Sequence, residues 1–230
     1  MVLEELTVRL NDREYTNWLK AGRCLLILKT GLHPFTDHQM RAHHRDLLNQ
    51  HALLSTPCET SSCKPIGNKL SSPCGLIQFR NELMHSCELR VKDDWIRHYW
   101  STLKHFVQQL SDVPQMATVG QQIEDMLTVD LSICVSGVDR VDSDGPLEGC
   151  ESDFVSQLET SAEKVSQWET ELLQEMLQEY LHVAAEEDGD AKAQDPEQLK
   201  RLQSFLQANK DLREKFSTEL QAINSLEVKE

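Results

Sequence analysis

The sequence predicts an all-α protein. Apolar residues recur three and four residues apart through most of the chain, which is the periodicity of amphipathic helices. Capping residues, prolines and glycines divide this pattern into segments of helical length. Hydrophobic residues make up 39% of the 230 residues, which suffices for a core, so we expect several helices packed as a bundle.

Charge divides the chain into two parts. Residues 1–130 hold 14 basic and 15 acidic side chains, whereas residues 131–230 hold 9 basic and 23 acidic ones. We predict a helical domain at 1–130, an acidic linker at 131–153 and a helical unit at 154–226. Because an acidic back part repels nucleic acid at long range, any contact with RNA is expected in the front part.

The first two helices are predicted from their capping signals. Asn11 is expected to cap a helix that ends at Gly31, because glycine commonly follows the last turn of a helix. Pro34 is then expected in a turn, and Thr36 opens a capping box that starts a second helix reaching Leu54. Residues 51–75, rich in Ser, Thr, Pro and Cys, are predicted to form an irregular loop.

Further helices complete the front part. Pro73 is expected in the first turn of a helix that carries the apolar residues of 76–84. The pair Asp93-Asp94, whose charges suit the positive end of a helix, begins the next one. Pro114 is expected to end that unit, and a short helix is predicted near Gln121–Val129.

The back part is predicted to form an amphipathic αα-hairpin. In its first helix a heptad-like apolar stripe lacks one position, which Glu169 occupies. Asp195 and Pro196 open the second helix as its cap and first residue. Because a lone hairpin buries only one stripe, it packs on the front part or associates with another chain, and the sequence leaves both open.

The segment from Arg80 to His85, RNELMH, sets a cation, a carboxamide and an imidazole within six residues. On a helix, Asn81 and His85 share one face, and Arg80 lies beside them. Arginine binds a phosphate with two donors and histidine transfers protons near neutral pH, which is the minimum for cleaving RNA without a metal. The alternative, which spacing alone favours, is an ordinary amphipathic helix with a polar edge.

Other candidate sites carry weaker signals. Cys58, Cys63 and Cys74, with His51 nearby, are zinc-ligand types, but their spacing matches no zinc finger, so no metal is expected. Neither a phosphate-binding glycine loop nor a G-x-S-x-G motif occurs, and no cofactor is expected. Packing in the core is favoured over stacking on bases for three aromatic residues: Trp95, Tyr99 and Trp100.

The compartment is predicted from the thiols and the N-terminus. Glu4 and Glu5 do not fit a secretory signal, and the apolar run at 24–28 is too short to span a bilayer. Seven cysteines, an odd number, favour reduced thiols in the cytoplasm or nucleus. We therefore expect an intracellular protein without a membrane partner.

The stretch RNELMHSCELRVKDDWIRHYWSTLKHFVQQL, from Arg80 to Leu110, resembles the signature of the HEPN fold. In that fold an R-N-x-x-x-H segment ends one helix, and a helix with an acidic start and early aromatic residues follows a short loop. This motif, the early sequence RLNDREYTNWLKAGRCLLILKTGL and the late sequences LLQEMLQEYL and FLQANKDLREK also resemble an uncharacterised vertebrate protein family. That family is named for open reading frame thirty-eight of the X chromosome.

The resemblance implies a HEPN-like domain at 1–130. In active members of that superfamily the arginine and histidine form a ribonuclease pair, usually across a dimer. Carried over, His85 would be the acid and base for attack of a ribose 2′-hydroxyl on its phosphate, Arg80 would stabilise the charge on that phosphate, and Asn81 would orient the pair. Many HEPN domains only bind or dimerise, so the resemblance leaves catalysis open.

One departure from the family decides the expected function. Residues 51–79 are a short stretch where the family carries a longer segment with apolar helical sequence. A bundle that loses a helix holds catalytic residues less firmly. We therefore expect a non-catalytic interaction protein, whose bundle forms a homodimer and whose acidic hairpin docks a protein partner. The alternative is an RNA-binding protein or metal-independent endoribonuclease that uses Arg80 and His85.

Overall fold

The computed structural model describes residues 2–50, 74–86, 88–131, 151–185 and 196–227, and all regular secondary structure among them is helical. The prediction of an all-α protein is therefore confirmed. Pro73 and most of the predicted loop and linker, residues 51–73 and 132–150, lie outside the described residues. None of the described helices combines the length and the apolar composition that a membrane-spanning helix needs.

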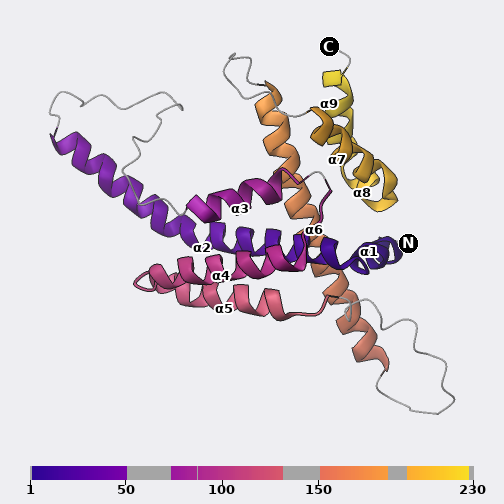
Figure 1. Cartoon of the computed structure of the whole chain (residues 1–230), viewed down its shortest axis with the longest axis horizontal. Coiled ribbons are helices and arrows are strands. Elements are labelled where there is room, and N and C mark those ends of the chain that lie inside the picture. Colours follow the sequence, from indigo (N-terminus) through magenta and orange to yellow (C-terminus); the bar gives the residue numbers. More distant parts are fainter. Residues whose placement is uncertain (1, 51–73, 87, 132–150, 186–195, 228–230) are drawn as a thin grey trace.

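Helix α2 (Arg13–Gln50) lies at the centre of the molecule (Figure 1). It follows α1 (Val2–Leu10), and α4 (Asp93–Gln109) and α5 (Pro114–Thr128) pack along it. Helix α3 (Cys74–Met84) packs against both α2 and α4. These elements make up the described front part.

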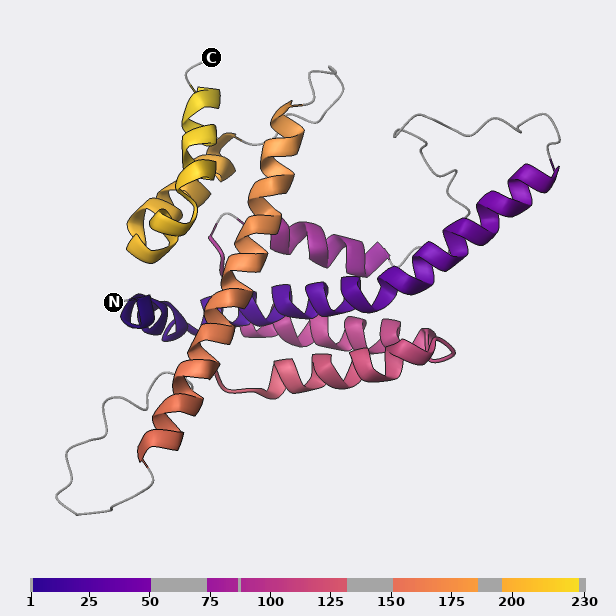
Figure 2. The same cartoon turned by 180° about the vertical axis from the view of Figure 1, so that it is seen from behind.

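Helix α6 (Glu151–Ala185) crosses α2, as both views show (Figure 2). It is followed by α7 (Pro196–Ala208), α8 (Lys210–Lys215) and α9 (Ser217–Glu227), which pack beside α6 and reach α1. The front and back parts therefore meet along α6 and between α1 and α8.

One hydrophobic core joins the described helices of both parts. It extends from Leu6 on α1 and Trp18 on α2 to Leu172 on α6 and Leu212 on α8, all of which are at most 1% exposed. The predicted stripe of α6 is buried from Ala162 to Met176. Of the two arrangements that the sequence left open for the back part, packing within the chain is the one observed.

The predictions for residues 11–50 are wrong at three points, because one uninterrupted helix spans Gly31, Pro34 and Thr36. Gly31 lies in close contact with α5, where an added Cβ would lie 2.2 Å from Cγ2 of Val119. The hydroxyl of Thr36 donates to the carbonyl oxygen of Leu32 at 3.1 Å, inside the helix instead of capping its start. The helix bends part way along its length (Figure 2), as expected for an internal proline.

The start of α2 differs from the prediction by one residue. The carboxylate of Asp12 accepts hydrogen bonds from the backbone N–H groups of Glu14 and Tyr15, at 2.9 and 3.3 Å. These are two of the first N–H groups of a helix, which have no partner within it. Asp12 therefore caps the helix, and the prediction of Asn11 is wrong.

Two further boundaries are corrected. Pro114 occupies the first turn of α5 instead of only ending the preceding unit, so this helix has 15 residues and begins well before Gln121. The second arm of the predicted hairpin is three short helices, with breaks at Asn209 and Phe216. The side chain of Asn209 donates to the carbonyl oxygen of Phe205 and accepts from Arg9, so a contact with α1 coincides with the first break.

Candidate functional site

The end of α3 brings the three predicted site residues together. Phe79 and Leu83 turn the apolar face of α3 into the core, which leaves Arg80 and Asn81 on the outer face. His85 directly follows the helix, and its N–H still donates to the carbonyl oxygen of Asn81 at 2.9 Å. The guanidinium of Arg80 donates to Oδ1 of Asn81 at 3.2 Å. The side chains of Arg80 and His85 are 42% and 39% exposed, so both are open to solvent.

The connection after His85 is tied to α2, as far as it is described. The N–H of Val91 donates to the carbonyl oxygen of Glu14 at 2.9 Å, and the side chain of Asn17 donates to the carbonyl oxygen of Val91 at 3.1 Å. Leu89 is fully buried with a positive φ of 52°, a backbone conformation that a leucine keeps only when its surroundings impose it. These contacts fix where α3 ends and α4 begins.

A residue that the sequence analysis did not single out, Glu179 on α6, faces the motif. Its two carboxylate oxygens accept hydrogen bonds from the two terminal nitrogens of Arg80, one of them at 2.8 Å. Nε2 of His85 lies 3.8 Å from Oε1 of the same carboxylate. Arg80 and His85 therefore already share an anionic partner within the chain.

The next residue of α6, Tyr180, lies beside the imidazole of His85. Tyr180 is buried, and its ring lies edge-on to the ring of His85 with the centroids 6.0 Å apart. Its hydroxyl lies 3.3 Å from Oε1 of Gln198 on α7. Tyr180 thus links the imidazole of the motif to α6 and α7.

Glu179 belongs to a row of three glutamates, Glu171, Glu175 and Glu179, spaced four residues apart on one face of α6. We call these residues the glutamate row. Each one pairs with a cation of the front part: Glu171 with Arg23 at 2.7 Å, Glu175 with Lys29, and Glu179 with Arg80. The glutamate row therefore neutralises positive side chains of α2 and α3.

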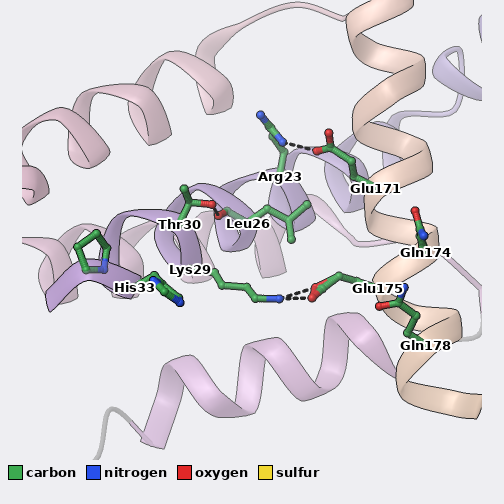
Figure 3. A pocket seen from close by; sticks show the side chains of 10 residues that line it. Arg23, Leu26, Lys29, Thr30, His33, Glu171, Gln174, Glu175 and Gln178 are labelled. Atoms are coloured by element: carbon green, nitrogen blue, oxygen red, sulfur yellow. Dashed lines mark hydrogen bonds and ion pairs between the residues drawn. The ribbon is translucent and has the colours of Figure 1, made fainter. Parts of the chain in front are cut away.

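The first two pairs cross an open groove of about 550 Å³ between α2 and α6 (Figure 3). Leu26 and Pro34 form an apolar part of its wall on the α2 side, and Gln174 and Gln178 line the α6 side. Because its charged side chains face one another across the gap, the groove offers a ligand little unbalanced charge.

A second charged cluster is buried where α1 meets α6 and α8. The guanidinium of Arg9 binds Glu169 through two hydrogen bonds of 2.7 and 2.8 Å. It also binds Asp211 through two hydrogen bonds of 3.0 and 2.7 Å. The hydroxyl of Tyr15 donates to Glu169 at 2.6 Å. Glu169 is 0% exposed, so the polar gap in the predicted stripe is the centre of a buried ion network.

The protonation of this cluster follows from its contacts. Burial lowers the pKa of the Arg9 guanidinium, but hydrogen bonds to Glu169 and Asp211 outweigh it, so the pKa lies above the ordinary value for arginine. Burial raises the pKa of Asp211, but the hydrogen bonds from Arg9 and the contact with Glu5 lower it by a larger amount. Its pKa therefore lies below the ordinary value for aspartate. One guanidinium therefore binds the carboxylates of Glu169 and Asp211 away from solvent.

Two of the three aromatic residues predicted to pack in the core, Tyr99 and Trp95, do so. Tyr99 is fully buried and its hydroxyl donates to the carbonyl oxygen of Ala21 at 3.1 Å. The ring of Trp95 stacks on Tyr99 with the centroids 5.2 Å apart and meets Phe79 edge-on. Trp100 is partly buried.

The structure offers no support for a metal site among the described residues, where no cluster of three potential ligands occurs. The predicted weak candidates lie elsewhere: His51, Cys58 and Cys63 are outside the described residues, as is the side chain of Cys74. Cys24 is a free thiol in the core, and burial raises its pKa to about 12, so it stays protonated at neutral pH.

Comparison with known proteins places the chain in a family. The mouse protein (Mus musculus) named "Uncharacterized protein CXorf38 homolog" is 27% identical over an alignment 308 positions long, which covers 98% of this chain and 93% of that protein. No solved structure matches the chain. A family model described as "Domain of unknown function (DUF4559)" matches residues 9–75 and 68–229. The chain therefore belongs to the family of this domain, DUF4559.

Proposed function

We propose that this protein is a non-catalytic helical interaction protein. Its HEPN-like front part forms a homodimer, and its acidic C-terminal helices dock a protein partner. The observation that carries the non-catalytic role is the ion pair between Arg80 and Glu179. A catalytic arginine must offer its paired donors to a phosphate, and here both terminal nitrogens donate to a carboxylate of the same chain.

The second half of α2 supports association. From Thr36 to Asp46 no described residue of this helix is buried or packs on the core, and the helix extends beyond its neighbours (Figure 1). Most helices in proteins are stabilised by packing of one face instead of by intrinsic propensity. Met40 is exposed in this segment and is an apolar contact that a second copy would cover.

The position of the partner follows from the charges that are already paired. Glu169 and the glutamate row are engaged by cations of the front part. A partner of the acidic helices would therefore meet their outer faces, where Glu163 and Glu214 are exposed. We propose a basic surface on that partner.

The proposal also covers where the protein is located and why its middle segment is short. We propose an intracellular, cytoplasmic or nuclear location, supported by the odd number of cysteines and by the free thiol of Cys24. We also propose that residues 51–79 stand for a longer segment in relatives. This shortening would weaken the support of the motif for catalysis.

The second candidate function is RNA binding or metal-independent cleavage of RNA. The observation that favours it is the meeting of Arg80, Asn81 and His85 at one solvent-open point, the groups that this chemistry requires. If the side chain of Glu179 moves away, Arg80 can bind a phosphate and His85 can accept or donate a proton.

Cleavage of single-stranded RNA in EDTA separates the two functions. We expect the wild-type chain to cut RNA no faster than His85→Ala or Arg80→Ala, since Arg80 is paired with Glu179 and the shortened segment at 51–79 would weaken the support of the motif. Cleavage by the wild type that either substitution abolishes would contradict the non-catalytic proposal and favour the second candidate.

Light scattering tests the homodimer. We expect a dimer that Met40→Glu dissociates, because a carboxylate on the exposed part of α2 would be buried against a second copy. Val8→Glu is the matched control, since Val8 is also an exposed apolar residue but lies on α1. A monomer at high protein concentration would contradict dimerisation, whereas equal effects of both substitutions would place the interface elsewhere.

A further inference from the structure

We infer that Glu179 is an intramolecular competitor of RNA phosphate, so that a phosphodiester binds Arg80 and His85 only when this carboxylate leaves them. The inference rests on the second candidate function and adds a residue from α6 to the site. It holds whether or not the bound RNA is cleaved.

The geometry of the contact is that of a bound anion. A guanidinium presents parallel donors that fit two oxygens of a carboxylate or of a phosphate equally well. Arg80 donates in this way to both oxygens of Glu179, and Nε2 of His85 lies 3.8 Å from one of them. A phosphate in the same place would have its oxygens beside the same nitrogen atoms.

The competitor can leave without a movement of α6. The side chain of Glu179 is 25% exposed, and Arg80 and His85 are more exposed, so the ion pair lies at the surface. Surface ion pairs add little to stability, and a rotation about the side-chain bonds exchanges them with water. Because Tyr180 is buried beside His85, the backbone of α6 can stay in place when the side chain of Glu179 rotates away.

The neighbouring pair distinguishes local competition from a general effect of charge. Glu175 lies one turn away on the same face of α6 and carries the same charge, but it pairs with Lys29 of α2 instead of with the motif. Neutralising either glutamate changes the net charge by the same amount. Only Glu179 blocks Arg80.

Binding of a fluorescein-labelled single-stranded RNA oligonucleotide, measured by anisotropy in EDTA at low salt, tests the inference. We expect Glu179→Gln to bind about three- to tenfold more tightly than the wild type, and Glu175→Gln to differ by less than about twofold. Adding Arg80→Ala to Glu179→Gln should remove the gain. If circular dichroism shows that Glu179→Gln is poorly folded, Glu179→Asp gives the same contrast, because its carboxylate is one methylene further from Arg80.

Each outcome has a distinct meaning. Measurable binding that is the same for the wild type and Glu179→Gln would overturn the inference and leave RNA binding standing. An equal gain in Glu175→Gln and Glu179→Gln would also overturn it, because net charge would then explain the effect. Absence of binding in all variants would overturn the second candidate function and the inference together, without touching the interaction proposal.

Discussion

The guanidinium of Arg9 connects three helices that lie far apart in the sequence. It binds Glu169 of α6 and Asp211 of α8 from its position on α1, and all three side chains are at most 5% exposed. Taking charges out of water costs several kcal/mol per ion, and the cost is recovered only when every charge has close partners. Each member of the cluster is therefore needed by the others.

Removal of the guanidinium should be strongly destabilising. In Arg9→Met the apolar volume is kept, but Glu169 and Asp211 remain buried beside each other without a cation. We expect the free energy of unfolding to fall by about 3–5 kcal/mol, the usual cost of breaking a buried pair. Urea denaturation followed by circular dichroism measures it.

Arg13→Met provides the control for this prediction. Arg13 also pairs with an aspartate, Asp93, but its side chain is 80% exposed, so water replaces the lost contact. The same substitution should there leave the free energy of unfolding nearly unchanged. Equal losses in both variants would show that burial of the Arg9 cluster has no special cost.

Part of this cluster has a signal in the sequence. Glu169 interrupts an otherwise apolar stripe, and a charged residue in such a position needs a buried partner. The sequence does not reveal the partner, because Arg9 lies 160 residues away in a stretch that reads as an ordinary amphipathic helix. Only the packing of α1 against α6 and α8 reveals the pair.

At the scale of the helix, two glycines set how closely helices approach. An added Cβ at Gly22 would lie 2.0 Å from Cδ2 of Leu172 on α6, and one at Gly31 would lie 2.2 Å from Cγ2 of Val119 on α5. Both distances are far inside van der Waals contact. The glycines therefore allow α2 to be crossed closely by two different helices.

Gly31→Ala should destabilise the protein in spite of the better helix propensity of alanine. The gain of roughly 1 kcal/mol in propensity is opposed by overpacking of about 1–3 kcal/mol against Val119, whose branched side chain has little rotational freedom in a helix. We expect a lower midpoint of thermal unfolding, and partial recovery when Val119→Ala removes the clashing methyl groups.

Gly75→Ala makes the same chemical change where space exists, since the added Cβ would lie 3.5 Å from Cγ2 of Thr102. Alanine should there raise the midpoint or leave it unchanged. A higher midpoint for Gly31→Ala as well would contradict a packing role for that glycine.

These glycines also explain why the helix boundaries were predicted less well than the helices themselves. Glycine and proline commonly end helices, so local signals predict breaks at Gly31 and Pro34. In the folded chain the contact with α5 requires the glycine, and the helix continues through Pro34 with a bend. Tertiary contacts overrode the local preference.

At the scale of the whole molecule, the uneven charge has a structural role. The acidic residues of α6 that face α2 and α3 pair with Arg23, Lys29 and Arg80 of the nearly neutral front part. The sequence locates Arg80, Asn81 and His85 on adjacent turns, because helical spacing is local. It does not locate Glu179, because that carboxylate meets the motif only through the crossing of α6 over α2.

The shared core predicts that the front and back parts unfold together. Leu172 is buried on α6 against α2, so Leu172→Ala removes packing from both parts at once and should cost about 2–5 kcal/mol. In hydrogen exchange followed by mass spectrometry, the slowest amides of α4 and of α7 should lose protection by the same factor. Ile77→Ala, which truncates an exposed residue of α3, should change neither. Loss of protection confined to α6–α9 would mean that the two parts are separate folding units, with the contact along α6 adding little to the stability of either.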